Sequence, residues 1–561
     1  MKHCTLALII ALATSACAQT PAAPTVTHET HPLSAVTPKP LTDAQRKAHY
    51  ADVTKKIDDL LAQPDASRAF FGIQIMSLAN GQTIYETNAD RLFQPASNTK
   101  LFTTVAGLAL LGPDYRRLTT VETSGTLDKN GTLKGDLLLV GRGDPNISGR
   151  VLPYDKKTVR TTPSLKVLED IADAVAQKGL KRIDGDVIGD DTYFSYERFP
   201  EGWAADDLLW DYGAPVSALT INDNVVFMKM TPGAAVGEKI KVEFEPDAPY
   251  YEVDNRLTTA AAGTKRNISM DRQPGSRVLT LWGTIAMDDN VPNEALAIED
   301  PADFAAKAFR AMLEKRGIAV KGKDHSAHTY MASLPPLPTP LQVAQGASAV
   351  QPKPGGGAES TEQPKPQPRM VLASHQSQSL ADDVRVTDKV SQNLHAELTL
   401  RALGAVKGAQ PTAEASLNVL KGFLTEIGIA PEEYDFYDGS GLSRQGLVSP
   451  RAIVKLLQYA DYPSAWRDAF QAALPVAGED GSLAERMKGT PAQSHVWAKT
   501  GSFNHTTCLS GYIQTLSGER MAFSIMVNHH KLGGRGANKL IDQILETVVN
   551  DLESAAAAAK P

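Results

Sequence analysis

The sequence predicts an α/β protein in which an antiparallel sheet flanked by helices is split by a large, mainly β insertion. Strand-like runs stand near both ends of the 561-residue chain with helical patterns between them, so both ends can contribute to one sheet. From about Leu118 the pattern changes to short strands and turns, and residues 236–286 are nearly all β. A chain of this length is expected to form more than one domain.

The first residues have the layout of an export signal. Lys2 precedes the apolar run Leu6–Ala13, and small residues follow. Because the run is too short to span a membrane as a finished helix, we expect residues 1–18 to be a signal peptide. Residues 19–41 are rich in Pro, Thr and Ala and are expected to form a tether.

Two cleavage sites compete in this signal. Thr14-Ser15-Ala16-Cys17 is a weak lipobox, and cleavage there would leave a lipid anchor on Cys17. Ala16-Cys17-Ala18 is an A-x-A site, which would be cut before Gln19. Both readings predict an exported, periplasmic protein, tethered in the first case and soluble in the second.

Residues 42–117 are predicted to be the first part of the split domain. Thr42 caps a helix over 43–63, and two alternating runs, "FFGIQIMSL" and "QTIYETN", are joined by Asn80-Gly81, a strong hairpin signal. A helix with a buried apolar stripe follows Ser97 and ends at Gly112-Pro113.

Residues 118–333 are predicted to be the inserted region, of one or two subdomains. Helical stretches near Ser164–Lys178 and Pro301–Arg316 interrupt its strands, and 223–296 is a candidate nested β subdomain. Residues 334–369 include "QPKPGGGAESTEQPKPQP", a Pro-rich stretch with too little apolar surface to order itself, and are expected to form a flexible loop.

Residues 370–552 are predicted to be the second part of the split domain, followed by a tail at 553–561. Helical patterns cover Leu380–Leu403, Ala413–Ile427 and Pro450–Tyr459. Three strand-like runs follow, "SHVWAKTGSF", "CLSGYIQTL" and "RMAFSIMVNHH", and a last helix is expected over Ala537–Ser554.

The composition excludes some functions. The net charge is −7 with no long run of Lys or Arg, which argues against a nucleic-acid partner. Only one of three cysteines, Cys508, lies in the body of the chain, so we expect no internal disulfide and a packed core thiol. His505, His529 and His530 lack metal-ligand spacing, and we expect neither a metal nor another cofactor.

The segment "PASNTKLFTT" contains an S-x-x-K motif at a helix start. Positions three apart share a helix face, so the side chains of Ser97 and Lys100 can meet. A neutral lysine can activate a serine hydroxyl, and burial, nearby positive charge and the helix dipole all favour neutrality. Because about two chance matches are expected in such a chain, the motif alone favours an ordinary polar helix start.

Two further motifs stand near the end of the chain. Ser391-Gln392-Asn393 enters a helix, and by itself reads as a capping serine with a solvated asparagine. Lys499-Thr500-Gly501 lies on a predicted strand and is rarer, with on the order of 0.1 chance matches per chain. Its structural alternative is a strand lysine next to a turn glycine.

The order of the three motifs resembles that of active-site serine penicillin-binding proteins and β-lactamases. From about Phe71 to Asn528 the chain more closely resembles the D-alanyl-D-alanine carboxypeptidase/endopeptidase family, the class C low-molecular-mass penicillin-binding proteins of the fourth type. The resemblance rests on these phrases: "GDLLLVGRGDP", "IGDDTYF", "GWAADD", "YGAPVSALTINDN", "ASHQSQSLADDVRVTDKVSQNLHAE", "DGSGLSR" and "LPVAGEDGSLAERMKGTPA". The long insertion before S-x-N is that family's hallmark, whereas the Pro-rich 334–369 looks like a lengthened loop.

The resemblance implies a penicillin-binding, β-lactamase-like transpeptidase fold and a serine D-Ala-D-Ala carboxypeptidase, also a D,D-endopeptidase, acting on peptidoglycan stem peptides or cross-links. Ser97 would form the acyl-enzyme, with Lys100 as base, and β-lactams would acylate the same serine. Ser391 would relay a proton to the leaving amine.

The remaining roles are also implied by the resemblance. Asn393 would present its amide to the substrate and its carbonyl to Lys100. Lys499 and Thr500 would bind the terminal carboxylate of the peptide. The backbone N–H groups of Ser97 and Ser502 would form the oxyanion hole.

Three further expectations concern residues that lie outside the catalytic serines and lysines. Gly501 would let a substrate strand approach the sheet edge, because no Cβ intrudes. Asp190 and Phe194 would contact the peptide stem, with a turn Asp and a buried Phe as the alternatives. The loop Asp438–Ser443 lacks the spacing of a nucleophile elbow and would shape the cleft wall.

Two other functions compete. A serine β-lactamase shares the acylation machinery, but no carboxylate stands in an E-x-x-L-N setting between the motifs. A catalytically silent wall-binding protein on the same fold would be expected to have lost Ser97, Lys100 or Lys499, and all three are present.

Overall fold

The computed structural model describes residues 41–161, 163–247, 250–335 and 368–552. The predicted signal peptide 1–18, residues 19–40 of the tether, residues 336–367 of the Pro-rich loop and the tail 553–561 lie outside the described residues. Within the described ranges, no helix is both long and apolar enough to cross a membrane.

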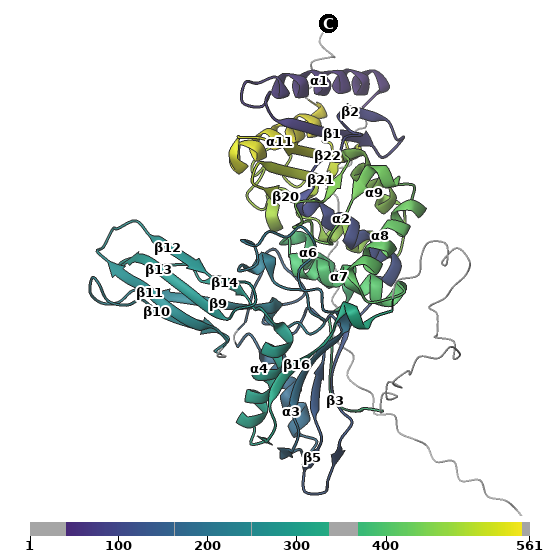
Figure 1. Cartoon of the computed structure of the whole chain (residues 1–561). Coiled ribbons are helices and arrows are strands. Elements are labelled where there is room, and N and C mark those ends of the chain that lie inside the picture. Colours follow the sequence, from purple (N-terminus) through teal and green to yellow (C-terminus); the bar gives the residue numbers. More distant parts are fainter. Residues whose placement is uncertain (1–40, 162, 248–249, 336–367, 553–561) are drawn as a thin grey trace, which may run out of the picture. The chain divides into compact units, whose positions relative to one another are not determined.

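Strands from both ends of the chain form one antiparallel sheet, in the order β2-β1-β22-β21-β20 (Figure 1). Its strands are β1 (Phe70–Ser77), β2 (Thr83–Thr87), β20 (Val496–Phe503), β21 (Thr506–Gln514) and β22 (Arg520–Asn528). β1 and β22 are paired from Phe70↔Asn528 to Ser77↔Met521. The predicted split antiparallel sheet is therefore confirmed.

Both faces of this sheet are covered. Along β22, Phe523 and Ile525 belong to a core that includes residues of α1 and α11, whereas Ala522 and Met526 belong to a second core. This alternation follows from the two-residue period of a strand. The helices are α1 (Asp43–Leu61), α2 (Thr99–Leu111), α6 (Leu380–Lys389), α7 (Asn393–Lys407), α8 (Ala413–Glu426), α9 (Pro450–Asp461), α10 (Arg467–Ala473) and α11 (Gly533–Val549).

Most predicted elements of the split domain form, with two differences. The helical pattern over Leu380–Leu403 is interrupted between α6 and α7, where Ser391 has φ +61°. α10 was not predicted. A short antiparallel pair completes this part, β18 (Tyr434–Asp435) with β19 (Leu447–Val448).

The inserted region has a five-stranded sheet of its own, in the order β16-β8-β6-β3-β17. Its strands are β3 (Leu118–Thr123), β6 (Leu137–Val140), β8 (Val187–Ser195), β16 (Asp324–Thr329) and β17 (Met370–Gln376). The pairs β6/β8 and β8/β16 are parallel. Because β17 pairs with β3, the chain is still in this sheet at Gln376, which favours a start of the second catalytic segment after that residue. The domain limits themselves stay a prediction.

Smaller elements complete the inserted region. Its helices are α3 (Lys166–Ala176) and α4 (Pro301–Lys315), and a four-stranded sheet contains β4 (Thr126–Leu127), β5 (Thr132–Lys134), β7 (Arg182–Ile183) and β15 (Ala319–Val320). Two three-stranded sheets contain β9 (Val225–Thr231), β10 (Lys241–Glu245), β11 (Glu252–Ala260), β12 (Asn267–Asp271), β13 (Val278–Ala286) and β14 (Glu294–Ala297). One hydrophobic core runs through these elements.

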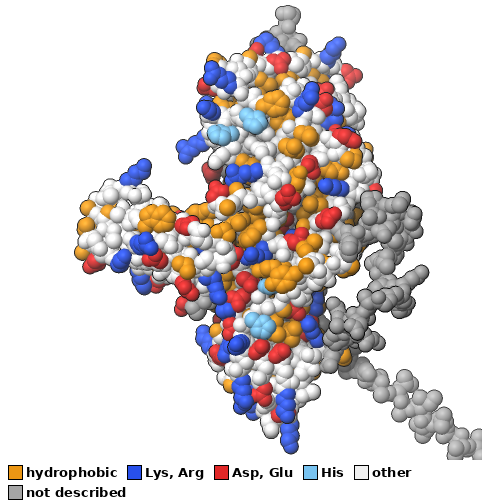
Figure 2. Space-filling view, viewed as in Figure 1, with side chains coloured by type: hydrophobic (Ala, Val, Ile, Leu, Met, Phe, Trp, Pro, Cys, Tyr) orange, Lys and Arg blue, Asp and Glu red, His pale blue; other side chains and the backbone are white. Residues whose placement is uncertain are grey.

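Charges of both signs are interspersed on the face shown in Figure 2, without a large region of one sign. This matches the mixed composition of the chain, 57 basic and 64 acidic residues. The face therefore offers no extended basic track of the kind that binds a phosphate backbone.

Candidate active site

Ser97 lies in a tight turn that packs against β20. The turn is a 3-10 helix, η1 (Ala96–Asn98), which leads into α2, and Ala96 has φ +46°. The Asn98 side chain donates a hydrogen bond to the Lys499 carbonyl at 3.1 Å. This bond ties the first motif to the third.

Gly501 is required by the close packing of β20 against the Ser97 turn. A Cβ at this position would lie 2.5 Å from the Pro95 carbonyl oxygen and 2.9 Å from Asn98 Nδ2. Contacts this short do not occur, so a side chain would push β20 away from the Ser97 turn. The structure thus gives the glycine a packing role, and the predicted access for a substrate strand stays a prediction.

Lys100 is fully buried and contacts three oxygen atoms. Its Nζ lies 2.8 Å from Ser97 Oγ, 2.6 Å from Asn393 Oδ1 and 2.7 Å from the Ser440 carbonyl oxygen. The amide and carbonyl oxygens only accept hydrogen bonds, whereas the serine hydroxyl can donate or accept.

This arrangement suits a neutral amine. A neutral lysine has two hydrogens and one lone pair, so it can donate to Asn393 and Ser440 and accept from the Ser97 hydroxyl. Burial and the positive charge of Lys499 hold the pKa of Lys100 well below its usual range, against the opposing pull of nearby carboxylates. The lone pair needed for proton removal is therefore available at Ser97.

Ser391 lies in the sharp turn between α6 and α7. Its φ of +61° is rare for a residue with a side chain, and α7 begins two residues later at Asn393. Lys499 Nζ donates to Ser391 Oγ at 2.8 Å and to the Thr500 carbonyl at 2.9 Å. The predicted capping serine is not observed, since Gln392 is the N-cap of α7.

Lys499 and Asp388 are two titratable side chains that affect each other's pKa. Both side chains are fully buried. Burial lowers the pKa of Lys499 to about 8, with the negative charge of Asp388 opposing the shift. Burial raises the pKa of Asp388 to about 7. Sequence patterns gave no sign of Asp388, because a lone carboxylate in a helix looks like part of a solvated face.

The loop Asp438–Ser443 holds the carbonyl that Lys100 contacts. Glu397 accepts hydrogen bonds from the backbone N–H groups of Gly439 and Ser440, at 2.8–3.1 Å. Asp438 accepts from the N–H groups of Gly441 and Ser443 and from the Trp203 indole. These buried carboxylates fix the loop; the pKa of Glu397 is raised to about 7 by burial and by Asp438.

A cleft in front of Ser97 brings the three motifs together. Its lining includes Ser97, Ser391, Asn393, Thr500, Gly501 and Ser502 from the motifs. Gly441 and Leu442 of the loop Asp438–Ser443 also line it, as predicted for the cleft wall. Further lining residues, which the sequence analysis missed, are Asp206, Asp207, Tyr212, Arg444, Phe503 and Asn504. The phrases "GWAADD", "YGAPVSALTINDN" and "DGSGLSR" contain or border most of the latter, so the resemblance marked the segments without assigning the side chains.

Asp190 and Phe194 lie outside the lining of this cleft, and their predicted contact with the peptide stem stays a prediction. Asp190 is buried and its carboxylate pairs with Arg369 at 3.1 Å. Phe194 is 2% exposed and packs in a cluster with Val216 and Leu394. Neither lines the cleft, because each side chain is enclosed by its own neighbours.

The cysteine and the three histidines near the last strands lie outside the cleft lining. Cys508 is fully buried in the core, as predicted, and burial raises the pKa of its thiol to about 12. His530 is also buried, with its Nε2 3.0 Å from Thr507 Oγ1, whereas His505 and His529 are exposed. Over the described part of the chain, no cluster of three or more His, Cys, Asp or Glu side chains could hold a metal ion.

A profile of the D-Ala-D-Ala carboxypeptidase 3 (S13) family matches residues 53–336 and 357–548. The chain belongs to this family. It is 32% identical over 494 residues to a D-alanyl-D-alanine carboxypeptidase of Actinomadura sp. (strain R39), covering 86% of this chain and 82% of the relative. It is 24% identical over 487 residues to D-alanyl-D-alanine carboxypeptidase DacB of Haemophilus influenzae, covering 86% and 88%.

The fold of this S13 family member is also that of a solved structure. Penicillin binding protein 4 (dacB) from Haemophilus influenzae superimposes with a TM-score of 0.71 and 23% identity, over 88% of this chain and 99% of that chain. A second structure of that protein, complexed with a β-lactam, has a TM-score of 0.67. The predicted family, fold class and serine carboxypeptidase class are therefore confirmed.

Proposed function

We propose that Ser97 is the nucleophile of this D-Ala-D-Ala carboxypeptidase and that neutral Lys100 is its base. The observation that carries the proposal is the 2.8 Å contact between the buried Lys100 Nζ and Ser97 Oγ, with the pKa of Lys100 lowered by burial and by Lys499. Ser97 Oγ attacks the carbonyl of the D-Ala-D-Ala bond while Lys100 Nζ takes the hydroxyl proton. The backbone N–H groups of Ser97 and Ser502 are the proposed donors to the oxyanion.

Ser391 then protonates the leaving amine. Its hydroxyl gives a proton to the nitrogen of the terminal D-alanine as the C–N bond breaks, and Lys499 Nζ, 2.8 Å away, returns a proton to Ser391. Free D-alanine and an ester on Ser97 result. Water then hydrolyses the ester: its oxygen bonds to the acyl carbon and its proton passes through Ser391 to Lys499, while the proton held by Lys100 returns to Ser97 Oγ as it leaves.

Substrate binding is assigned to the rim of the same cleft. Protonated Lys499 attracts the terminal carboxylate, and Thr500 donates its hydroxyl to it. Asn393 is proposed to offer an amide to the substrate backbone. The cleft also carries Asp207 and Arg444, which form an ion pair with each other at 3.3 Å.

The substrate is proposed to be a peptidoglycan stem peptide or a D,D cross-link in the periplasm. The family and the export-signal layout of residues 1–18 support this location, with a lipid anchor at Cys17 or a free start at Gln19 as the two forms. The position of the cleft beside residues of the inserted region supports access for branched peptides as well as free stems.

The test is D-alanine release from a synthetic stem peptide, measured for the wild type and Ser97→Ala. We expect Ser97-dependent release of one D-alanine per peptide, and slow turnover of benzylpenicillin. Release that survives in folded Ser97→Ala would contradict the assignment. Rapid benzylpenicillin turnover without D-alanine release would instead indicate the β-lactamase alternative.

A further inference from the structure

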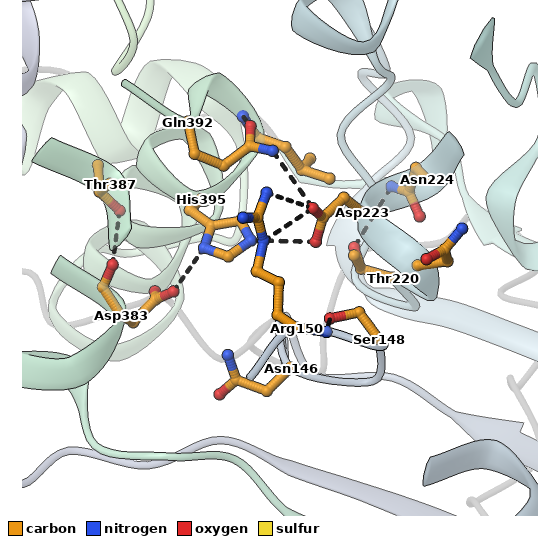
Figure 3. A network of polar contacts seen from close by, with 12 residues as sticks. Asn146, Ser148, Arg150, Thr220, Asp223, Asn224, Asp383, Thr387, Gln392 and His395 are labelled. Atoms are coloured by element: carbon orange, nitrogen blue, oxygen red, sulfur yellow. Dashed lines mark hydrogen bonds and ion pairs between the residues drawn. The ribbon is translucent and has the colours of Figure 1, made fainter. Parts of the chain in front are cut away.

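A buried ion network joins the inserted region to the S-x-N segment (Figure 3). Its centre is Asp223, whose side chain is 1% exposed. Asp223 Oδ2 accepts from Arg150 at 2.6 and 3.0 Å and from Arg160. Burial alone would raise the pKa of Asp223, but the two arginines hold it well below its usual range. The carboxylate is therefore ionised.

His395 lies between Asp223 and a second buried carboxylate (Figure 3). Its Nε2 lies 3.3 Å from Asp223 Oδ1, and its Nδ1 lies 2.7 Å from Asp383 Oδ1. All three side chains are 0–1% exposed. Burial alone would lower the pKa of His395, but the carboxylates raise it, which favours an imidazolium bridging the two regions.

The turn that presents Asp223 is strained. Asn222, Asp223 and Asn224 have φ values of +50°, +57° and +57° in succession. Both asparagine side chains bind local carbonyl groups, of Val225 and Pro215, at 2.8 and 2.9 Å. Three left-handed residues in a row cost several kcal/mol, on the order of 1–3 each, so the fold must hold this turn in place. Strain of this kind is concentrated at functional sites.

Contacts from the inserted region also reach Gln392 and Asn393 of the S-x-N motif. Gln392, which stands between Ser391 and Asn393, caps α7 through Oε1 and places Nε2 3.4 Å from Asp223 Oδ2. Asn393 Nδ2 donates to the Tyr212 carbonyl of the inserted region at 2.8 Å. The inserted region thus holds the turn whose side chains contact Lys100 and Lys499.

We propose that Asp223 is a positioning residue for the reaction: through Gln392 and His395 it holds Ser391 and Asn393 at their distances from Lys499 and Lys100. The proposal rests on the roles given to Ser97, Lys100 and Ser391 above. It assigns the inserted region a part in proton transfer, in addition to its contribution to the cleft wall.

A second Asp-His-Asp group provides a matched control. His328 Nδ1 lies 2.7 Å from Asp191 Oδ1, and its Nε2 lies 3.3 Å from Asp300 Oδ2. The distances equal those at His395, but all three residues belong to the inserted region and none lines the cleft. If Asp223 has a purely structural role, Asp223→Asn should, like Asp191→Asn, lower stability without a selective effect on the amide substrate.

The experiment compares acylation rates of folded Asp223→Asn and Asp191→Asn, using an amide stem peptide and a thiolester of the same acyl group. A thiolate leaves without a proton, so loss of Ser391 alignment should slow the amide more than the thiolester. We expect Asp223→Asn to slow the amide by about 10- to 100-fold, with a smaller loss on the thiolester and little change in KM. Asp191→Asn should lower thermal stability and leave both rates near wild type.

Gln392→Glu tests the same link without removing the buried carboxylate. Gln392 is only partly buried, and the glutamate keeps an acceptor for the Leu394 N–H but repels Asp223. We expect the same selective loss on the amide. If folded Asp223→Asn or Gln392→Glu acylates both substrates like wild type, or loses both equally, the positioning role is wrong. Absence of Ser97-dependent acylation in the wild type would instead overturn the proposed function.

Discussion

The split domain and the inserted region both bury arginines, including Arg117 and Arg401 in the split domain, but they differ in their buried lysines. Among the described residues, the only buried lysines are Lys100, Lys389 and Lys499, and all three lie in the split domain. In the inserted region the most enclosed arginine side chains are Arg150 and Arg272, at 8% and 2% exposure. Each arginine pairs with a buried carboxylate.

Buried lysines can exchange protons, whereas buried arginines keep their charge. Burial lowers the pKa of each of the three lysines, so their protons are held loosely. A guanidinium stays charged under all working conditions and binds carboxylates through a planar fork. The split domain can therefore move protons at Ser97 and Ser391, while the inserted region holds the neighbouring turn with charges that do not titrate.

The largest effect on activity is expected when the active-site lysine Lys100 is replaced by arginine. Lys100→Arg keeps a positive charge but cannot lose its proton, so general-base activation of Ser97 is lost. We expect acylation by a stem peptide or a β-lactam to fall about 10²- to 10⁴-fold, measured by stopped-flow or gel fluorescence. The matched exchange Arg272→Lys should keep at least half of the activity. Equal losses in both variants would contradict the comparison.

A smaller effect is expected at Lys499. The pKa of about 8 means that the lysine loses its charge above that pH, so capture of the peptide carboxylate should weaken on the alkaline side. Lys499→Arg keeps the charge to higher pH but cannot return a proton to Ser391, so we expect roughly a 10-fold loss of activity. The pH profile of kcat/KM should fall above pH 8 in the wild type and stay flat there in Lys499→Arg. If kcat/KM falls above pH 8 in both the wild type and Lys499→Arg, a group other than Lys499 causes the fall.

Asp388→Asn should shift the alkaline fall of kcat/KM to lower pH. The negative charge of Asp388 raises the pKa of Lys499, so its removal makes Lys499 lose its proton at lower pH. We expect roughly a 2- to 5-fold loss of kcat/KM at pH 8 and little loss at pH 6.5, from steady-state kinetics across pH. A limb that stays at its wild-type pH would show that Asp388 does not act on Lys499.

The smallest effect on activity is expected from the titrating histidine of the inserted region. Burial alone would lower the pKa of His328, but its bonds to Asp191 and Asp300 raise it to about 9. A raised folded-state pKa adds stability that is complete below the unfolded value of about 6.5 and disappears as pH rises through about 9. Thermal melts should show this decline in the wild type and not in His328→Gln, whose acylation rate should match wild type. A wild-type melting temperature that stays constant from pH 6.5 to 9 would refute it.

Local patterns predicted the parts of the site that are local. The Asn80-Gly81 hairpin, the helix after Ser97 and the strand with Lys499 all form where the sequence indicates. At Ser391-Gln392-Asn393 the sequence indicated a helix start but not the left-handed turn at Ser391, because apolar periodicity continues through Leu380–Leu403. The parallel pairs of the inserted region involve strands as short as Arg182–Ile183, which carry no periodic signal.

The rest of the site depends on contacts between distant segments. The Ser440 carbonyl and the carboxylates of Glu397 and Asp388 reach the lysines only after folding, and each looks like an ordinary helix or loop residue in the sequence. Asp223 stands in a phrase that the family resemblance marked, yet its link to His395 spans 172 positions. Residue type and spacing give no access to such pairs.

The most direct test of the central claim is the intact mass of the folded protein after brief incubation with benzylpenicillin. We predict an increase equal to one penicillin molecule, mapped by peptide digestion to the segment that contains Ser97, and no increase in Ser97→Ala. An adduct on another residue, or an unchanged adduct in Ser97→Ala, would contradict the assignment of Ser97 as the nucleophile.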